Sequence, residues 1–233
     1  MASKNILVLV EGAKTDMRLM TRLFEIYNLD DVFEIVSYNT NIYTLYNKMF
    51  HNQDTEFLDL LQTLKEHDKS KADIFDRKYS DIILIFDLDP QDSLYSYEKI
   101  SEMAEYFSES TDNGKLYLNY PMIEAFSHRK GVNDENYISR TICVDDLAIY
   151  KQIVSRYTSD PRKLGDNICD MSKIILQNLQ KANNIIQNPE YTYYPDLSKV
   201  LSSQIIKMEA DREIFVLCTC VFFIADYDKD LLR

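Results

Sequence analysis

Two short, continuously apolar segments that end in acidic residues constrain the fold of this chain most strongly. The first covers residues 5–10 (NILVLV) and runs into Glu11, and the second covers residues 81–86 (DIILIF) and runs into Asp87 and Asp89. Continuous Ile, Leu and Val runs of this length are typical of strands covered on both faces by helices. The sequence therefore predicts both acidic motifs at the carboxyl ends of buried strands, where open α/β sheets place their ligand sites.

Segments of helical periodicity alternate with these strands. Helices are predicted over residues 15–29, 42–49, 55–67 and 97–107, and further strands over residues 33–38 and 115–118. Strands that alternate with helices in this way are typical of a parallel sheet. We therefore expect residues 1–130 to form an α/β domain, with a mostly parallel sheet flanked by helices.

The pattern changes after about residue 127. Residues 145–157, 170–186 and 209–225 predict helices, with no convincing strand between them. The apolar run over residues 214–225 is far shorter than the ~20 residues that cross a bilayer, so it predicts a buried helix. Residues 131–233 are thus expected to form a helical extension.

Charge and cysteine usage limit the partners and the compartment. The net charge of −12 opposes contact with phosphates, so a nucleic-acid enzyme of this composition needs metal ions, a local basic patch or a partner protein. The four cysteines show no CxxC spacing, and residues 1–12 do not resemble an export signal. We expect a cytoplasmic protein with reduced thiols and no membrane segment.

The acidic motifs have the composition of a site for a hard cation. Alternation along an extended segment puts Asp87 and Asp89 on one side, and a neighbouring strand would bring Glu11 beside them. Mg²⁺ prefers such oxygen ligands. A single acid at the end of a strand is more often a solvated turn residue, but two coincident motifs favour a divalent-metal site.

Three stretches of the first 130 residues resemble one known family. VLVEGAKTD at residues 8–16 and ILIFDLD at residues 83–89 are similar to the Glu-Gly and Asp-x-Asp motifs of Toprim domains, found in topoisomerases, primases and OLD-type nucleases. The Lys-Thr-acid that follows Glu-Gly resembles RloB-like Toprim proteins of prokaryotic antiphage defence in particular. NYPMIEAF at residues 119–126 resembles their Asn-Pro-x-x-Glu-x-aromatic segment, with one extra residue before Pro121.

This resemblance implies a function and a set of site residues. It implies Glu11, Asp87 and Asp89 as metal ligands, with Asp16 and Glu124 as further ligands or residues that position water. One or two Mg²⁺ or Mn²⁺ ions would then support phosphodiester hydrolysis of DNA or RNA without a protein nucleophile. The implied role is that of a nuclease effector in antiphage defence, controlled by a partner such as an ATPase.

Basic residues near these motifs are candidates for holding the substrate phosphate. His128, Arg129 and Lys130 follow Glu124, although a basic surface loop is an equally good interpretation of that stretch. Lys14 and Lys207 are weaker candidates for the same role.

Two other interpretations compete with a nuclease. Phe86 to Asp89 also resembles the start of haloacid-dehalogenase-type phosphatases, in which Asp87 would be a nucleophile, but Pro90-Gln91 replaces their Gly-Thr and Glu11 would have no role. The other is a non-catalytic Toprim-like interaction module whose acids bind only a structural ion or a nucleotide.

A cluster of tyrosines follows the predicted helix over residues 170–186, at Tyr191, Tyr193 and Tyr194. These side chains would either stack on bases or pack a loop onto the core.

Overall fold

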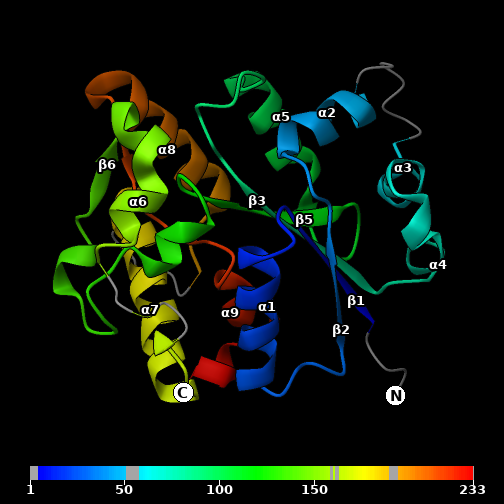
Figure 1. Cartoon of the computed structure of the whole chain (residues 1–233), viewed down its shortest axis with the longest axis horizontal. Helices are drawn as coiled ribbons and strands as arrows, with labels where there is room; N and C mark the ends of the chain where they lie inside the picture. The colour runs from blue at the N-terminus through cyan, green and yellow to red at the C-terminus, as the bar shows by residue number, and fades with distance from the viewer. Residues whose placement is uncertain (1–4, 51–57, 158–159, 161–162, 189–193, 233) are drawn as a thin grey trace.

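The computed structural model describes the chain except residues 1–4, 51–57, 158–159, 161–162, 189–193 and 233. Its main sheet has five strands in the order β2-β1-β3-β5-β4 (Figure 1). The strands are β1 (Ile6–Val10), β2 (Phe33–Ser37), β3 (Asp81–Asp87), β4 (Ser108–Glu109) and β5 (Gly114–Asn119). All neighbours pair in parallel except β4 and β5, so the expectation of a mostly parallel sheet flanked by helices is confirmed.

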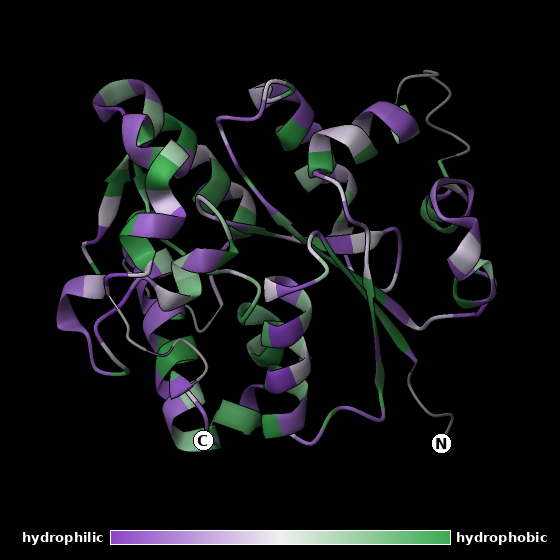
Figure 2. Cartoon of the chain, in the orientation of Figure 1, coloured by the Kyte–Doolittle hydropathy of each residue, from purple (hydrophilic) through white to green (hydrophobic). Residues whose placement is uncertain are grey.

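The two apolar segments form the centre of the sheet, as the sequence predicts. All five residues of β1 are buried, and so are residues 83–86 of β3. Figure 2 shows these strands coloured as hydrophobic along most of their length. A strand that is apolar on both faces needs helices on both sides, and the alternating helices supply them.

Many of the helices lie largely within the ranges that the sequence predicts, but residues 72–75 and 197–208 form helices that it does not predict. They are α1 (Thr15–Ile26), α2 (Ile42–Phe50), α3 (Leu60–His67), α4 (Ala72–Phe75), α5 (Tyr97–Tyr106), α6 (Tyr150–Val154), α7 (Ile168–Ile185), α8 (Leu197–Asp211) and α9 (Phe222–Tyr227). Short 3₁₀ segments include η3 (Ile123–Ser127) and η5 (Val144–Ile149). Helices α1 and α9 lie on one face of the sheet, and α2 and α5 lie on the other (Figure 1).

Local capping chemistry explains where several helices begin. The side chains of Asp59, Ser96, Asn167 and Asp196 accept hydrogen bonds from backbone N–H groups in the first turns of α3, α5, α7 and α8. Such side chains satisfy N–H donors that have no partner inside the helix. These polar residues therefore fix the start of each helix.

The predicted helix over residues 209–225 is wrong. Helix α8 ends at Asp211, Glu213–Phe215 forms strand β7, and α9 begins only at Phe222. Arg212 between α8 and β7 has a φ of 55°, which ends the helix in the left-handed region. A short, fully buried apolar run does not distinguish a strand from a helix by periodicity, because burial on all sides removes the alternation.

The expectation of no strand after residue 127 is also wrong. Strand β6 (Thr141–Cys143) pairs antiparallel with β7, and Ile142 lies opposite Ile214. The predicted helix over residues 145–157 is instead η5 followed by the short helix α6. Three-residue strands carry too little alternation to be recognised, whereas the long helix α7 was predicted nearly to its bounds.

The C-terminal segment returns to the main sheet after β7. Tyr120, which follows β5, exchanges backbone hydrogen bonds of 2.8 Å with Leu217. The hydroxyl of Thr219 donates to the carbonyl of Leu118 at 2.6 Å. The ring of Phe223 on α9 packs edge-on against Phe24 of α1 at 5.5 Å between centroids. Residues that follow the α/β domain in sequence thus complete its core.

Two composition-based expectations can be compared with the described residues. None of the helices within the described ranges is long and apolar enough to cross a membrane. All four cysteines are free thiols, and Cys218 and Cys220 are buried.

Candidate functional site

The parallel pairing of β1 with β3 brings the two acidic motifs together. Val10 lies opposite Ile85 in the register, so Glu11 and Asp87 both stand at the carboxyl edge of the sheet. One carboxylate oxygen of Glu11, Oε2, accepts a hydrogen bond from the backbone N–H of Asp87 at 3.1 Å. The backbone N–H of Glu11 donates to the carbonyl of Ile85, also at 3.1 Å. The first acid is therefore held directly against the strand that carries the second.

Asn119 at the end of β5 orients the Asp87 side chain. The register places Asn119 opposite Asp87, and its amide Nδ2 donates to Oδ1 of Asp87 at 3.2 Å. The amide oxygen of Asn119 accepts from the backbone N–H of Cys220 at 3.3 Å. Asn119 is fully buried, and a buried amide is stable only where both of its ends are hydrogen-bonded. This amide thus fixes the direction of the Asp87 carboxylate.

The Glu-Gly pair places Asp16 beside Glu11. Asp16 is buried in the first turn of α1, and the backbone N–H of Gly12 donates to its carboxylate. A Cβ atom at Gly12 would lie only 2.7 Å from Oδ2 of Asp16. The absence of a side chain at Gly12 therefore permits this approach, and a carboxylate in the first turn is favoured by the helix dipole.

Glu124 approaches from η3 and is paired with a lysine that the sequence did not suggest. The Nζ atom of Lys151 on α6 lies 3.4 Å from Oε1 of Glu124, while the other oxygen, Oε2, is buried and has no hydrogen-bond partner. The charges of Glu124, Asp87 and Asp16 all raise the pKa of Lys151, with Glu124 the largest contributor. Lys151 lies in no recognisable motif, so only the structure reveals it.

Asp89 follows strand β3 and has a backbone in the left-handed region. Its φ is 32°, and its N–H donates to the carbonyl of Pro121 at 3.1 Å. Its Oδ1 atom is buried without a hydrogen-bond partner. Asp92 lies nearby and accepts a hydrogen bond from the amide of Asn41. A left-handed backbone at a non-glycine residue is unfavourable, and such positions concentrate at functional sites.

Burial and mutual repulsion keep these carboxylates from ionising readily. Burial, together with the charges of Asp16 and Asp89, raises the pKa of Glu11 to about 7. Burial is also the main cause that raises the pKa of Asp87 well above its usual range, and the charges of Glu11, Asp16 and Glu124 add to it. Neighbouring carboxylates that share too few counter-charges are typical of cation-binding or acid–base sites.

The oxygen atoms of these side chains are of the kind that a hard divalent cation binds. Carboxylate and amide oxygens are the ligands that Mg²⁺ and Mn²⁺ prefer. The orphaned oxygens of Asp89 and Glu124 are buried acceptors that a cation would satisfy. Among the described residues, no three acidic, His or Cys side chains stand at the mutual spacing of a formed metal centre. The charges of Glu11, Asp16 and Glu124 all act on Asp87.

The predicted phosphate-binding residues divide into two groups. Lys14 and Lys130 are exposed. His128 and Arg129 are buried, and Arg129 donates to Gln177 and to the carbonyl of Phe126. Lys207 lies within α8 and pairs with Asp211 at 2.6 Å and with Glu213 at 3.1 Å. The side chains of His128, Arg129 and Lys207 thus make internal contacts.

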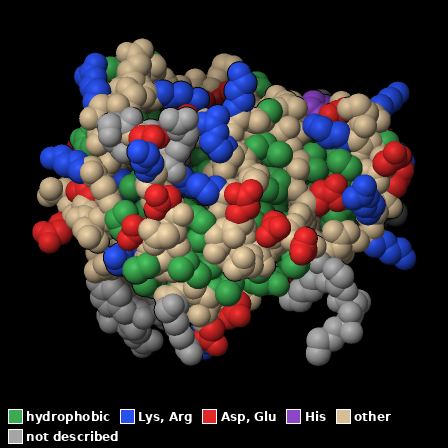
Figure 3. Space-filling model, turned by 60° about the horizontal axis from the view of Figure 1, so that its bottom comes forward, with side chains coloured by type: hydrophobic (Ala, Val, Ile, Leu, Met, Phe, Trp, Pro, Cys, Tyr) green, Lys and Arg blue, Asp and Glu red, His purple; other side chains and the backbone are tan. Residues whose placement is uncertain are grey.

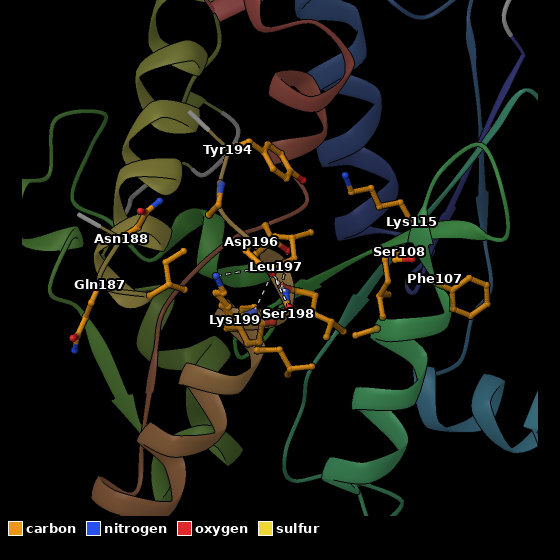
Figure 4. A pocket seen from close by; sticks show the side chains of 18 residues that line it. Phe107, Ser108, Lys115, Gln187, Asn188, Tyr194, Asp196, Leu197, Ser198 and Lys199 are labelled. Carbon is orange, nitrogen blue, oxygen red and sulfur yellow. Dashed lines mark hydrogen bonds and ion pairs between the residues drawn. The ribbon is translucent and has the colours of Figure 1, made fainter. Parts of the chain in front are cut away.

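A separate cavity lies away from the acidic residues. It has a volume of about 680 Å³ and is bounded by β5, the end of α5, the end of α7 and the start of α8 (Figure 4). Lys115 in its wall pairs with Asp226 at 2.7 Å and lies 4.9 Å from the ring centroid of Tyr194. Tyr194 packs against Phe222, whereas Tyr191 and Tyr193 lie outside the described residues. None of the predicted acidic residues lines this cavity.

Comparisons with known proteins do not place the chain in a family. No family model matches it, and no match was found among curated proteins or among solved structures. The α/β architecture and the grouping of acids at one edge of its sheet are therefore the observations on which a function can be argued.

Proposed function

We propose that this protein is a Toprim-like, Mg²⁺- or Mn²⁺-dependent nuclease that hydrolyses phosphodiester bonds at the Glu11–Asp87 edge of the sheet. The observation that carries the proposal is the hydrogen bond from the Asp87 N–H to Glu11, made where two parallel strands end side by side. It joins the Glu-Gly motif to the Asp-x-Asp motif. The phosphatase interpretation gives Glu11 no role, so this contact favours hydrolysis that depends on both acids.

Each residue has a defined task in this proposal. Glu11, Asp87 and Asp89 would hold the cation, and Asp16 and Glu124 would complete its ligands or accept a proton from the attacking water. The bound cation would supply charge stabilisation and lower the pKa of water. Asn119 keeps the carboxylate of Asp87 in place through its amide. The ammonium of Lys151, which lies 3.4 Å from Oε1 of Glu124, would bind the phosphate.

The net charge bears on how such an enzyme would be used. Because its net charge is −12, this chain would by itself bind a long nucleic-acid duplex weakly. On the face in Figure 3, the blue side chains of the described residues are scattered among red ones rather than gathered into one broad patch. We therefore propose that a partner protein, such as an ATPase of an antiphage system, delivers or gates the substrate.

Cleavage assays with site variants test the function. Labelled DNA and RNA, tRNA included, would be incubated with Mg²⁺ or Mn²⁺ and wild-type, Glu11→Gln or Asp87→Asn protein. Asp81→Asn is a matched control, because Asp81 begins the same strand that Asp87 ends. Metal-dependent cleavage lost in both site variants and retained in the control is expected. Absence of cleavage under every condition, including with candidate partners, would overturn the proposal.

A further inference from the structure

A groove runs along helix α1 and ends beside the acidic cluster of Glu11, Asp16, Asp87, Asp89 and Glu124. It has a volume of about 770 Å³ and lies between α1, η3 and α6. Its apolar lining includes Met17, Leu19, Phe126 and Val154. Glu124 and Lys151, which pair with each other, also line it and mark the end that meets the cluster. Of that cluster only Glu124 lines the groove, so the groove reaches the proposed hydrolytic site at that residue.

Basic residues form a row along the α1 wall of this groove. Lys14, Arg18 and Arg22 are spaced four residues apart, so one helical face carries all three at intervals of about 6 Å along the axis. Arg18 and Arg22 line the groove, and Lys14 precedes Thr15, which also lines it. Within the described ranges, Lys14 and Arg18 are exposed and form no ion pair. In an acidic protein, this row is a local exception, although Glu25 also lines the groove and the charge of Asp166 acts on Arg22.

We propose that this groove binds a single-stranded segment of nucleic acid and leads it to the acidic cluster. Successive phosphates of the strand would lie along Lys14, Arg18 and Arg22, and at least one base would enter the apolar part of the groove. The inference rests on the proposed function and names the form of its substrate. It also assigns binding roles to Arg18 and Arg22, which the sequence motifs do not include.

The arrangement of charge and apolar surface favours a single strand over a duplex. A duplex keeps its bases stacked inside and presents mainly phosphate and sugar, so an apolar floor beside the cations would have no partner. A single strand exposes the apolar faces of its bases. The guanidinium of Arg22 lies 5.5 Å from the ring centroid of Phe126, so a planar cation and an aromatic ring already adjoin where a base would enter.

The small number of cations predicts a weak dependence on salt. Lys14, Arg18, Arg22 and Lys151 can together neutralise only a few phosphates. For a single strand, the slope of log K against log salt would be about −3 or shallower. A duplex held by a broad basic surface would give a steeper slope. The slope therefore reports which kind of contact the groove makes.

Binding measured without cleavage tests the groove independently of hydrolysis. Fluorescence anisotropy would follow labelled single strands of about 12 nucleotides, as DNA and RNA, and the matching duplexes. The protein would carry Asp87→Asn, which removes the proposed chemistry. The test variant adds Arg18→Glu to this background. The control variant instead adds Lys69→Glu, the same charge reversal at a distant exposed lysine.

We expect Arg18→Glu to weaken single-strand binding at least tenfold and to make the salt slope shallower by about 1. Lys69→Glu should bind like its parent, and the duplex should bind more weakly than the single strand. Equal effects of the two charge reversals, tighter binding of the duplex, or no binding of either form would overturn the proposal. Cleavage that requires Asp87 but is unaffected by Arg18→Glu would refute the groove and keep the nuclease. Single-strand binding through Arg18 without any metal-dependent cleavage would support the groove and refute the nuclease.

Discussion

The carboxylate of Glu11 accepts a hydrogen bond from the backbone N–H of Asp87, so the side chain of one acidic motif is fixed by the main chain of the other. The two residues are 76 positions apart in the chain and meet only because β1 and β3 pair in parallel. This contact holds two acids close together in a buried place where their charges repel. The site therefore opposes the stability of the fold, with consequences that can be measured.

Glu11→Gln is expected to stabilise the protein at neutral pH. The pKa of Glu11 is raised from 4.5 to about 7, so between these values the folded state binds more protons than the unfolded state. Its ionisation thus costs stability as the pH rises from about 4.5 to 7. Glutamine keeps an acceptor oxygen for the Asp87 N–H and should add about 2 to 3 kcal/mol to the free energy of unfolding at pH 8.

Urea denaturation at pH 4 and pH 8 without divalent cations would measure this effect. The gain should vanish at pH 4, where both states carry the proton. Glu105→Gln on the exposed side of α5 is the control, and it should change little at either pH. A Glu11→Gln protein that is less stable than wild type at pH 8 would show that burial and repulsion of the Glu11 charge do not dominate.

A divalent cation should stabilise the wild-type fold. Mg²⁺ or Mn²⁺ binding to the native carboxylates, at a hundred times its dissociation constant, adds about 2.7 kcal/mol to the free energy of unfolding. Because the carboxylates must lose protons to bind, calorimetry near pH 6 should detect proton release. Asp87→Asn should abolish the shift in melting temperature, whereas Asp81→Asn should retain it. Equal shifts in both variants would place the cation elsewhere.

Gly12→Ala should disturb the site more than the fold. The added methyl group would lie 2.7 Å from Oδ2 of Asp16 and would force that carboxylate to move. We expect at least a tenfold loss of metal affinity, read from the metal-dependent shift in melting temperature. Gly131→Ala is the matched control, because a Cβ there meets nothing within 4 Å. Identical metal affinity in the two variants would contradict the role of Gly12.

Asn119→Ala should lower the free energy of unfolding by about 2 to 4 kcal/mol. The substitution removes a fully buried amide and leaves the N–H of Cys220 and one oxygen of Asp87 without a partner. Guanidinium denaturation against Asn113→Ala, a change in the turn before the same strand, would measure the loss. A cost no larger than that of Asn113→Ala would mean that water replaces both hydrogen bonds.

The contribution of His128 to stability should decline in mild acid, against the gain from Glu11 in the same range of pH. Burial, with the charges of Arg140 and Lys181, lowers the pKa of His128 from 6.5 to about 4. At this residue the unfolded state therefore binds more protons in this window, and its contribution to stability falls as the pH drops from 6.5 toward 4. His128→Asn should remove on the order of 1 to 2 kcal/mol from this decline. Unfolding curves of wild type and His128→Asn at half-unit steps of pH would measure how stability depends on pH. An unchanged dependence in the variant would exclude His128 as its source.

The central strands and the meeting of Glu11 with Asp87 could be predicted because each depends on a strong local signal. The apolar runs of β1 and β3 are buried on both faces, and parallel strands end at the same edge of a sheet. Strand β7 was missed because it has three residues, of which only Ile214 is fully buried, and these are too few to show an alternation. Lys151 could not be found because its role depends on α6 folding back over Glu124.

The amide of Asn119 links the acidic edge of the sheet to the C-terminal segment. Its one amide group contacts Asp87 with its nitrogen and the N–H of Cys220 with its oxygen. Cys220 belongs to the returning C-terminal segment, which contributes none of the proposed acidic ligands. A shift of this buried segment by a fraction of an ångström would turn the amide and so realign Asp87. A change in the packing of the C-terminal half of the chain would therefore alter the acidic edge without touching any of its proposed ligands.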